Sequence, residues 1–214
     1  WRDFDQKAAA LGANAADFAH TSFPTSGTCA SLGAIHQYAA WADEGKRRYG
    51  VFDIADDSCL NGWTMGNVLT TPSDLAKFWF DLFRTEDHLG LSDAALANLV
   101  HFEPLTTGWS VGLQYGFGTM LSGMRDATGN YSDFATLIGH GGEDYGSLAE
   151  LNGYNPKLNF SITLAMGSAV GMNCSNSAEA NFGAKGTAAC YLYDQVLQMI
   201  AAAEGLDIPK LACG

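Results

Sequence analysis

The chain has 214 residues, of which 47% are apolar and 16% charged, and a mean hydropathy of −0.01, values that exclude a disordered or fibrous chain and allow one compact domain. Its 11 basic and 23 acidic residues give a net charge of −12, which argues against nucleic acid or an anionic membrane surface as a partner. No apolar run approaches the roughly 18 residues that a membrane-spanning helix needs, so no membrane span is expected.

Residues 1–60 are predicted to form a region of helices and loops. Residues 5–19 are rich in alanine and predict a helix, whereas residues 22–31 contain Ser, Thr, Gly and Pro and predict a loop. Residues 35–42 predict a short second helix, and residues 49–54 form a strand-like run.

Residues 61–214 carry clearer signals, which begin with a capped amphipathic helix. Thr71, Pro72 and Asp74 supply an N-cap hydroxyl, a proline at the first helical position and an acidic residue in the first turn. Ser92 is the expected cap of a second helix. The apolar residues of the first helix recur at helical spacing: Leu75, Phe78, Trp79, Leu82 and Phe83.

After Pro104 the pattern changes to glycine-punctuated strands, and the last two of these are expected to pair as an antiparallel hairpin. Helical spacing returns at Thr187 and stops at Gly205. Helices, then an antiparallel meander, then a covering helix predict a layered α+β fold. The predicted strands cover residues 115–121, 134–140, 147–154 and 160–167.

Cysteines and glycosylation sequons favour an exported protein. The five cysteines form no C-x-x-C pair and no metal-like spacing with the five histidines, so a zinc site is not expected. Sequons at Asn130, Asn159 and Asn173, together with cysteines spread along the chain, favour an extracytoplasmic, disulfide-bonded glycoprotein. An odd cysteine count leaves one thiol unpaired or bonded to another chain, and Cys213 near the C-terminus is the expected one.

A G-x-S-x-G sequence places Ser110 between Gly108 and Gly112, the pattern of the nucleophilic serine in α/β-hydrolases. In those enzymes a helix follows the serine, whereas residues 113–121 are predicted here as strand. A strand-entry turn is therefore the favoured interpretation. A self-sufficient α/β-hydrolase that uses Ser110 remains an alternative.

A second glycine-rich segment, residues 139–146, places His140 between two predicted strands. Glycines allow a ligand to approach the backbone closely, and they let consecutive N–H groups point into one site. A histidine in such a turn is also commonly a hydrogen-bonded turn residue. The residues alone leave both a structural and a catalytic role for His140 open.

Three segments occur in a fixed order: residues 66–78 (GNVLTTPSDLAKF), 115–118 (YGFG) and 139–142 (GHGG). A predicted hairpin and a C-terminal helix follow them. This order and spacing resembles the C-terminal half of the serine β-lactamase-related family, which includes class C β-lactamases, D-Ala-D-Ala carboxypeptidases and family VIII esterases. The resemblance implies the C-terminal part of a penicillin-binding-protein-like α+β fold, in which helices flank an antiparallel sheet.

In that family the third active-site motif, Lys-Thr-Gly or His-x-Gly, lies on an edge strand, and residues 140–142 match its His-x-Gly form. The resemblance implies that His140 supplies a polar or cationic group near the attacked centre. It also implies that the backbone amide of Glu143 is an oxyanion-hole donor. Gly141, Gly142 and Asp144 would contact the substrate, and the strand edge would hold a peptide-like substrate by β-strand addition.

Two other motifs of the family are absent from the sequence. The nucleophile motif is S-x-x-K, in which the lysine activates the serine, and no serine of this chain has a lysine three residues later. The Tyr-x-Asn or Ser-x-Asn motif is absent as well. Both motifs precede the matching region in the family, so an N-terminal portion or a companion chain is expected to carry the nucleophile.

The acidic pair Glu143 and Asp144 bears on the substrate, because its negative charge disfavours a free carboxylate. An ester, or a neutral or cationic amide, is therefore the expected substrate. The resemblance implies the C-terminal part of a serine hydrolase that acts on a small-molecule ester, amide or peptide through an acyl-enzyme and needs no metal or other cofactor. The alternative is a catalytically inactive relative that keeps the scaffold as a binding or structural glycoprotein.

Overall fold

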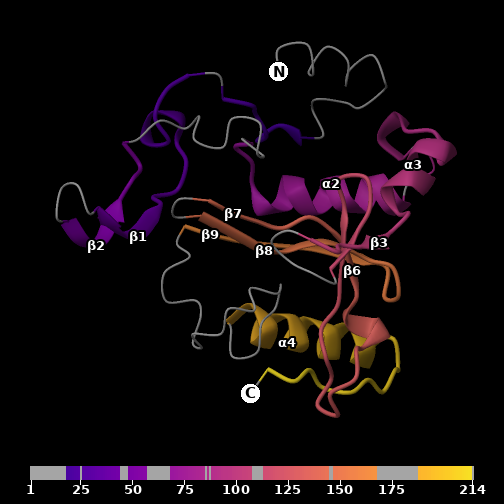
Figure 1. Cartoon of the computed structure of the whole chain (residues 1–214). Coiled ribbons are helices and arrows are strands. Elements are labelled where there is room, and N and C mark those ends of the chain that lie inside the picture. Colours follow the sequence, from indigo (N-terminus) through magenta and orange to yellow (C-terminus); the bar gives the residue numbers. More distant parts are fainter. Residues whose placement is uncertain are drawn as a thin grey trace.

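The computed structural model describes residues 18–24, 26–43, 48–56, 68–84, 86, 88–107, 113–144, 147–167 and 188–213. In these residues an antiparallel sheet lies between two long helices, α2 above it and α4 below it in Figure 1. None of the helices in the described part of the chain is long and apolar enough to cross a membrane. The layered arrangement confirms the α+β fold that the sequence predicts.

All described strands beyond residue 100 belong to this one sheet, and every pairing in it is antiparallel. Its order is β3-β4-β5-β6-β8-β9, and the short strand β7 pairs with the same side of β8 as β6 does. The strands are β3 (Glu103–Pro104), β4 (Gln114–Tyr115), β5 (Met120–Ser122), β6 (Leu137–Gly139), β7 (Gly142–Asp144), β8 (Ser147–Asn155) and β9 (Phe160–Met166).

The predicted helix caps are confirmed. Thr71 Oγ1 accepts a hydrogen bond from the Asp74 amide at 3.2 Å, and Ser92 Oγ accepts one from the Ala95 amide at 3.3 Å. Each bond satisfies an amide that has no partner within its helix. The helices are α2 (Pro72–Arg84), α3 (Asp93–Leu99) and α4 (Ala188–Ala203), and short 3₁₀ turns lie at Ala30–Leu32, His88–Gly90 and Asp133–Ala135.

Strand β8 separates two apolar cores, because alternate residues of a strand face opposite sides of the sheet. Tyr154 packs with Trp79 and other residues of α2 on one side. Leu151 packs with Tyr193 of α4 on the other side, and both of these side chains are completely buried. Burial on both faces fixes the register of β8, since a shift by one residue would exchange the two faces.

The helix predicted at residues 35–42 is wrong. Tyr38–Asp43 forms strand β1, which pairs with β2 (Arg48–Asp53) in a separate antiparallel hairpin. The Tyr38 amide also donates to the carbonyl oxygen of Gly167, just after β9, at 2.8 Å. The next strand and the distant Gly167 thus satisfy the backbone of this segment, and their pairing outweighs the helix-like spacing of a short window.

The segment at residues 115–121 is a hairpin and not the single strand predicted. Its turn lies between β4 and β5, and Gly118 in the turn has a φ of +86°, a left-handed conformation that suits glycine. A Cβ on Gly116 would lie 2.2 Å from the carbonyl oxygen of Leu99. The turn can therefore pack against the end of α3 only because residue 116 is glycine.

The other predicted elements correspond to the structure, with shifted ends. The strands predicted at residues 147–154 and 160–167 are the hairpin β8–β9, and the strand at residues 49–54 is β2. The strand predicted at residues 134–140 begins with a 3₁₀ turn and is strand only in β6. The helix predicted at residues 5–19 lies outside the described residues except for its last two.

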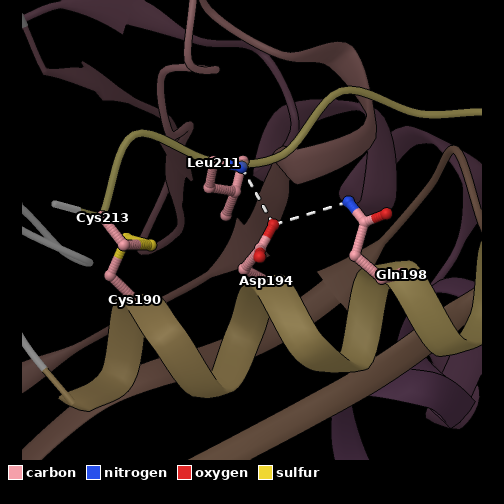
Figure 2. The surroundings of a disulfide bond; sticks show 5 residues. All are labelled: Cys190, Asp194, Gln198, Leu211 and Cys213. Atoms are coloured by element: carbon pink, nitrogen blue, oxygen red, sulfur yellow. Dashed lines mark hydrogen bonds between the residues drawn. A yellow bond between two sulfur atoms is a disulfide. The ribbon is translucent and has the colours of Figure 1, made fainter.

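A disulfide joins Cys190 at the start of α4 to Cys213 in the C-terminal tail, with the Cα atoms 5.6 Å apart (Figure 2). Asp194, one turn further along α4, is buried and accepts hydrogen bonds from the Leu211 amide at 2.9 Å and from Gln198 at 3.5 Å. Cys213 is thus not the unpaired thiol that the sequence predicts. The C-terminal tail turns back over α4 and brings Cys213 to Cys190. The spacing of the cysteines in the sequence does not reveal this reversal.

Candidate functional site

The predicted site lies where strands β6 and β7 meet end to end along β8. His140 and Gly141 form the link between the two strands. His140 is half-buried and Gly141 is buried, whereas Gly142, the first residue of β7, is exposed. The chain therefore passes at this link from the interior of the sheet to an accessible edge.

Strand β8 is irregular opposite this link. Between the pairs Gly139–Gly153 and Gly142–Ala149, β8 contributes three residues and the link contributes two. The pairing of β8 with β9 shifts register across Glu150 as well. β8 therefore contains a bulge centred on Glu150, and such bulges bend a strand and are common beside active sites.

Glycines allow the strands to approach closely just before His140. A Cβ on Gly139 would lie 1.9 Å from the carbonyl oxygen of Asn152, and a Cβ on Gly153 would lie 2.6 Å from that of Ile138. A Cβ on Gly142 would meet no described atom within 4 Å. Packing thus requires glycine at residue 139, whereas the missing side chain at residue 142 leaves the edge of the strand open.

The imidazole ring of His140 is held at both nitrogens. Nδ1 lies 2.6 Å from the carbonyl oxygen of Gly141, and Nε2 lies 2.8 Å from Tyr115 Oη. A carbonyl oxygen can only accept, so Nδ1 carries the proton and donates it to Gly141. In the neutral ring Nε2 is then an acceptor, and the hydroxyl of Tyr115 donates to it.

Asn152 of β8 holds the backbone of His140 at both ends. Its carbonyl oxygen accepts from the His140 amide at 3.2 Å, and its Nδ2 donates to the His140 carbonyl at 2.8 Å. Its Oδ1 accepts from Trp79 Nε1 at 2.7 Å and from Thr163 Oγ1 at 3.0 Å. One side-chain amide thus connects α2, β9 and the link that carries the histidine.

Strand β7 is an edge of the sheet. It pairs with β8 on one side, and no described strand pairs with its other side. Gly142, Glu143 and Asp144 form β7 itself, and His140 and Gly141 directly precede them in the link. The unpaired amide and carbonyl groups of an edge can bind an extended ligand.

Tyr115, Asn152 and Trp79 are contacts of this site that the sequence did not predict. The register explains the first of them: Tyr115 pairs with Met120 on β5, and Met120 pairs with Gly139 on β6. Tyr115 therefore lies two strands away from Gly139, the residue before His140. In sequence, 25 positions separate Tyr115 from His140. If the turn between β4 and β5 had been predicted at its correct position, the antiparallel register would have placed Tyr115 near His140.

Two further expectations concern metal binding and Ser110. Among the described residues, no group of three or more His, Cys, Asp or Glu side chains is placed to hold a metal ion. Ser110 and its flanking glycines lie outside the described residues, so the G-x-S-x-G interpretation stays a prediction.

No protein-family model matches the sequence, and no curated protein matches it at a significant level. Among solved structures, the chain is similar to D-amino acid amidase from Ochrobactrum anthropi SV3 in complex with L-phenylalanine amide, with a TM-score of 0.57 and 20% sequence identity. The similarity covers 92% of this chain and 49% of the amidase, so the chain spans about half of that protein's length. The chain has the β-lactamase- and penicillin-binding-protein-like α+β fold, which confirms the fold that the resemblance implied.

Proposed function

We propose that this chain is part of a β-lactamase-like serine hydrolase that cleaves an amide or ester bond through a serine acyl-enzyme. The observation that carries the proposal is that, in this fold, residues 140–142 lead directly into the edge strand β7, whose first residue, Gly142, is exposed. The sequence resemblance assigns the third active-site motif to the same residues. Sequence pattern and backbone geometry therefore favour one location.

Each residue of the edge has a role in this proposal. His140 provides a polar group near the attacked carbonyl, held in place by Asn152. The backbone amide of Glu143 donates to the oxyanion of the tetrahedral intermediate, a contribution that is commonly about 3 kcal/mol. Gly141, Gly142 and Asp144 contact the substrate, whose extended part adds to the edge of β7.

The nucleophile in this proposal is a serine on an N-terminal portion or a companion chain that carries the S-x-x-K motif. No serine of this sequence has a lysine three residues later.

The substrate we propose is a neutral or cationic amide, with esters of the same kind as a second choice. Glu143 and Asp144 place two acidic residues in the edge strand, which disfavours a substrate carboxylate. The neighbour is a D-amino acid amidase in complex with L-phenylalanine amide. An amino acid amide carries an ammonium group and no carboxylate, so it is a suitable first substrate to assay.

We also propose that the protein is exported. The Cys190–Cys213 disulfide and the exposed sequon residues Asn130 and Asn159 are consistent with an oxidising compartment. Glycosidase treatment of the native protein, followed by intact-mass measurement, should lower its mass if the sequons carry glycans.

A fluorophosphonate probe tests the proposed function directly, because it labels an activated serine covalently. We expect labelling of a serine in S-x-x-K in the purified native protein, and ammonia release from amino acid amides that the probe abolishes. The His140→Ala variant should keep its fold and turn over more slowly. Normal turnover in that variant would remove His140 from the site.

The second candidate is a catalytically inactive binding glycoprotein, which the missing S-x-x-K motif favours. This candidate predicts no probe labelling in the native protein and a single polypeptide of 22.7 kDa by mass spectrometry under reducing and non-reducing conditions. A labelled serine on any copurifying chain would exclude it.

A further inference from the structure

We propose that Tyr115 is the residue that transfers protons in this active site and that His140 acts as its relay, an inference that rests on the proposed hydrolase function. The resemblance implies that His140 lies near the attacked centre. The tyrosine hydroxyl lies 2.8 Å from Nε2 of this ring.

Both ring nitrogens of His140 already have partners within the chain. Nδ1 donates to the Gly141 carbonyl at 2.6 Å, and Nε2 accepts from Tyr115 Oη at 2.8 Å. The ring therefore has no nitrogen left for a substrate or a nucleophile. Tyr115 Oη donates its one proton to Nε2 and keeps its own lone pairs, so it can accept a proton from a reacting group.

Tyr115, His140 and the Gly141 carbonyl form a hydrogen-bonded chain of the kind that activates a hydroxyl group. A hydroxyl (Tyr115) donates to a base (His140), and a third group (the Gly141 carbonyl) orients that base through its other nitrogen. The base is also fixed in position, since Asn152 bonds both the amide and the carbonyl of His140. A relay of this kind needs such fixed geometry, because proton transfer requires hydrogen-bond distances.

The surroundings of Tyr115 leave its hydroxyl near the accessible edge. Tyr115 is half-buried at the end of β4, and the turn that follows it exposes Phe117, which is 81% accessible. Its hydroxyl contacts the residue two positions before β7 begins. The phenol therefore lies beside the strand to which the substrate is proposed to add.

The proton steps balance without another reactant. As the nucleophilic serine oxygen bonds to the carbonyl carbon, its proton moves by way of the S-x-x-K lysine to Tyr115 Oη, and the proton of Tyr115 moves to His140 Nε2. The resulting imidazolium donates from both nitrogens, to Tyr115 and to Gly141. When the carbon–nitrogen bond of the amide breaks, the same protons return through Tyr115 to the leaving amine.

Turnover of the Tyr115→Phe variant is the first test, with Tyr191→Phe as the matched control because Tyr191 is an exposed tyrosine on α4, on the opposite side of the sheet from α2. We expect kcat for an amino acid amide to fall about a hundredfold in Tyr115→Phe, with KM nearly unchanged. Tyr191→Phe should match the wild type. A kcat within twofold of wild type in Tyr115→Phe would overturn the proposal.

Chemical modification of His140 separates this proposal from the proposed function. Diethylpyrocarbonate attacks an imidazole nitrogen that bears a free lone pair, and Tyr115 occupies the lone pair of Nε2 in the wild type. We expect several-fold faster modification of His140 in Tyr115→Phe than in the wild type or Tyr191→Phe. Equal rates in all three would show that the Tyr115–His140 bond is absent, which overturns the relay.

The two readouts together distinguish the two failures. If the probe labels the wild type and Tyr115→Phe turns over normally, the role of Tyr115 is wrong and the hydrolase function stands. If the wild type neither reacts with the probe nor hydrolyses amides while Tyr115 still protects His140, the hydrolase function is wrong and the proton-transfer role falls with it.

Discussion

Two asparagines three residues apart on β8 face opposite sides of the sheet, and each bonds an aromatic residue of the helix that covers its side. Asn152 accepts from Trp79 of α2 at 2.7 Å, and Asn155 donates to Tyr193 of α4 at 3.0 Å. Asn155 is completely buried, whereas Asn152 is half-buried. The same residue type thus anchors a helix on each side of one strand.

The other hydrogen-bond partners of the two asparagines lie in different parts of the molecule. Asn155 donates to the Phe134 carbonyl at 2.7 Å and accepts from the Lys157 and Leu158 amides in the β8–β9 turn. Asn152 instead bonds the backbone of His140. The bonds of Asn155 therefore stay within the α4 side of the sheet, whereas those of Asn152 extend from the α2 side into the candidate site.

Loss of the disulfide should have the largest effect on stability and should affect only the α4 side. Replacing Cys190 and Cys213 with serine opens a loop of 23 residues and should lower the free energy of unfolding by about 3 kcal/mol. Denaturant titration measures this loss. Protection of His140 from diethylpyrocarbonate should be unchanged, and a loss of that protection in the folded variant would show that the two sides are not independent.

The two glycines that flank the His140–Gly141 link should respond differently to alanine. Gly139→Ala places a Cβ 1.9 Å from the Asn152 carbonyl and should cost about 2 kcal/mol of stability. Gly142→Ala meets no described atom within 4 Å and should change stability by less than about 0.5 kcal/mol, while it raises KM by covering the strand edge. Thermal unfolding and amide hydrolysis measure the two effects, and equal destabilisation would contradict the close approach at residue 139.

Alkaline pH should weaken the α4 side with little effect at neutral pH. Burial raises the pKa of Tyr193 well above its ordinary value, although the hydrogen bond from Asn155 lowers it. The buried phenol stays neutral while the unfolded one ionises near about pH 10, so stability is fully present below about pH 10 and falls as the pH rises further. Tyr193→Phe should lose about 1 kcal/mol at neutral pH and decline less between about pH 9 and about pH 11.

Tyr191→Phe is the control for that experiment, because Tyr191 lies on the same helix and is 52% exposed. Its stability should follow the wild type at every pH. The same alkaline decline in Tyr193→Phe and Tyr191→Phe would mean that Tyr193 does not cause it. Tyr154, whose pKa burial also raises, adds a smaller decline of the same sign.

The sequence predicts the elements whose signals are local. α2 has its cap, first-turn acid and apolar spacing within 13 residues, and the hairpin β8–β9 follows from alternation and a turn. The fold class and the position of His140–Gly142 at a strand end were therefore predictable. These features depend on neighbours in sequence, which a pattern reveals.

The remaining features depend on contacts between distant segments. β1 begins where the Tyr38 amide bonds the distant Gly167 carbonyl, and Cys213 is bonded because the tail reverses over α4. Tyr115 meets His140 through the register of three strands. No local pattern encodes these contacts, so a single sequence does not reveal them.

The most direct test of the account compares Asn152→Ala with Asn155→Ala in kcat for amino acid amide hydrolysis, each at a temperature where circular dichroism shows the variant folded. We expect Asn155→Ala to lose about 3 kcal/mol of stability and to keep kcat, since its partners belong to the core. Asn152→Ala should lose about 2 kcal/mol, because Trp79 and Thr163 lose their acceptor, and should lower kcat about tenfold or more, because the bond to the His140 carbonyl is removed. Equal kcat in the two variants would contradict the claim that the α2 side of β8 positions the active site.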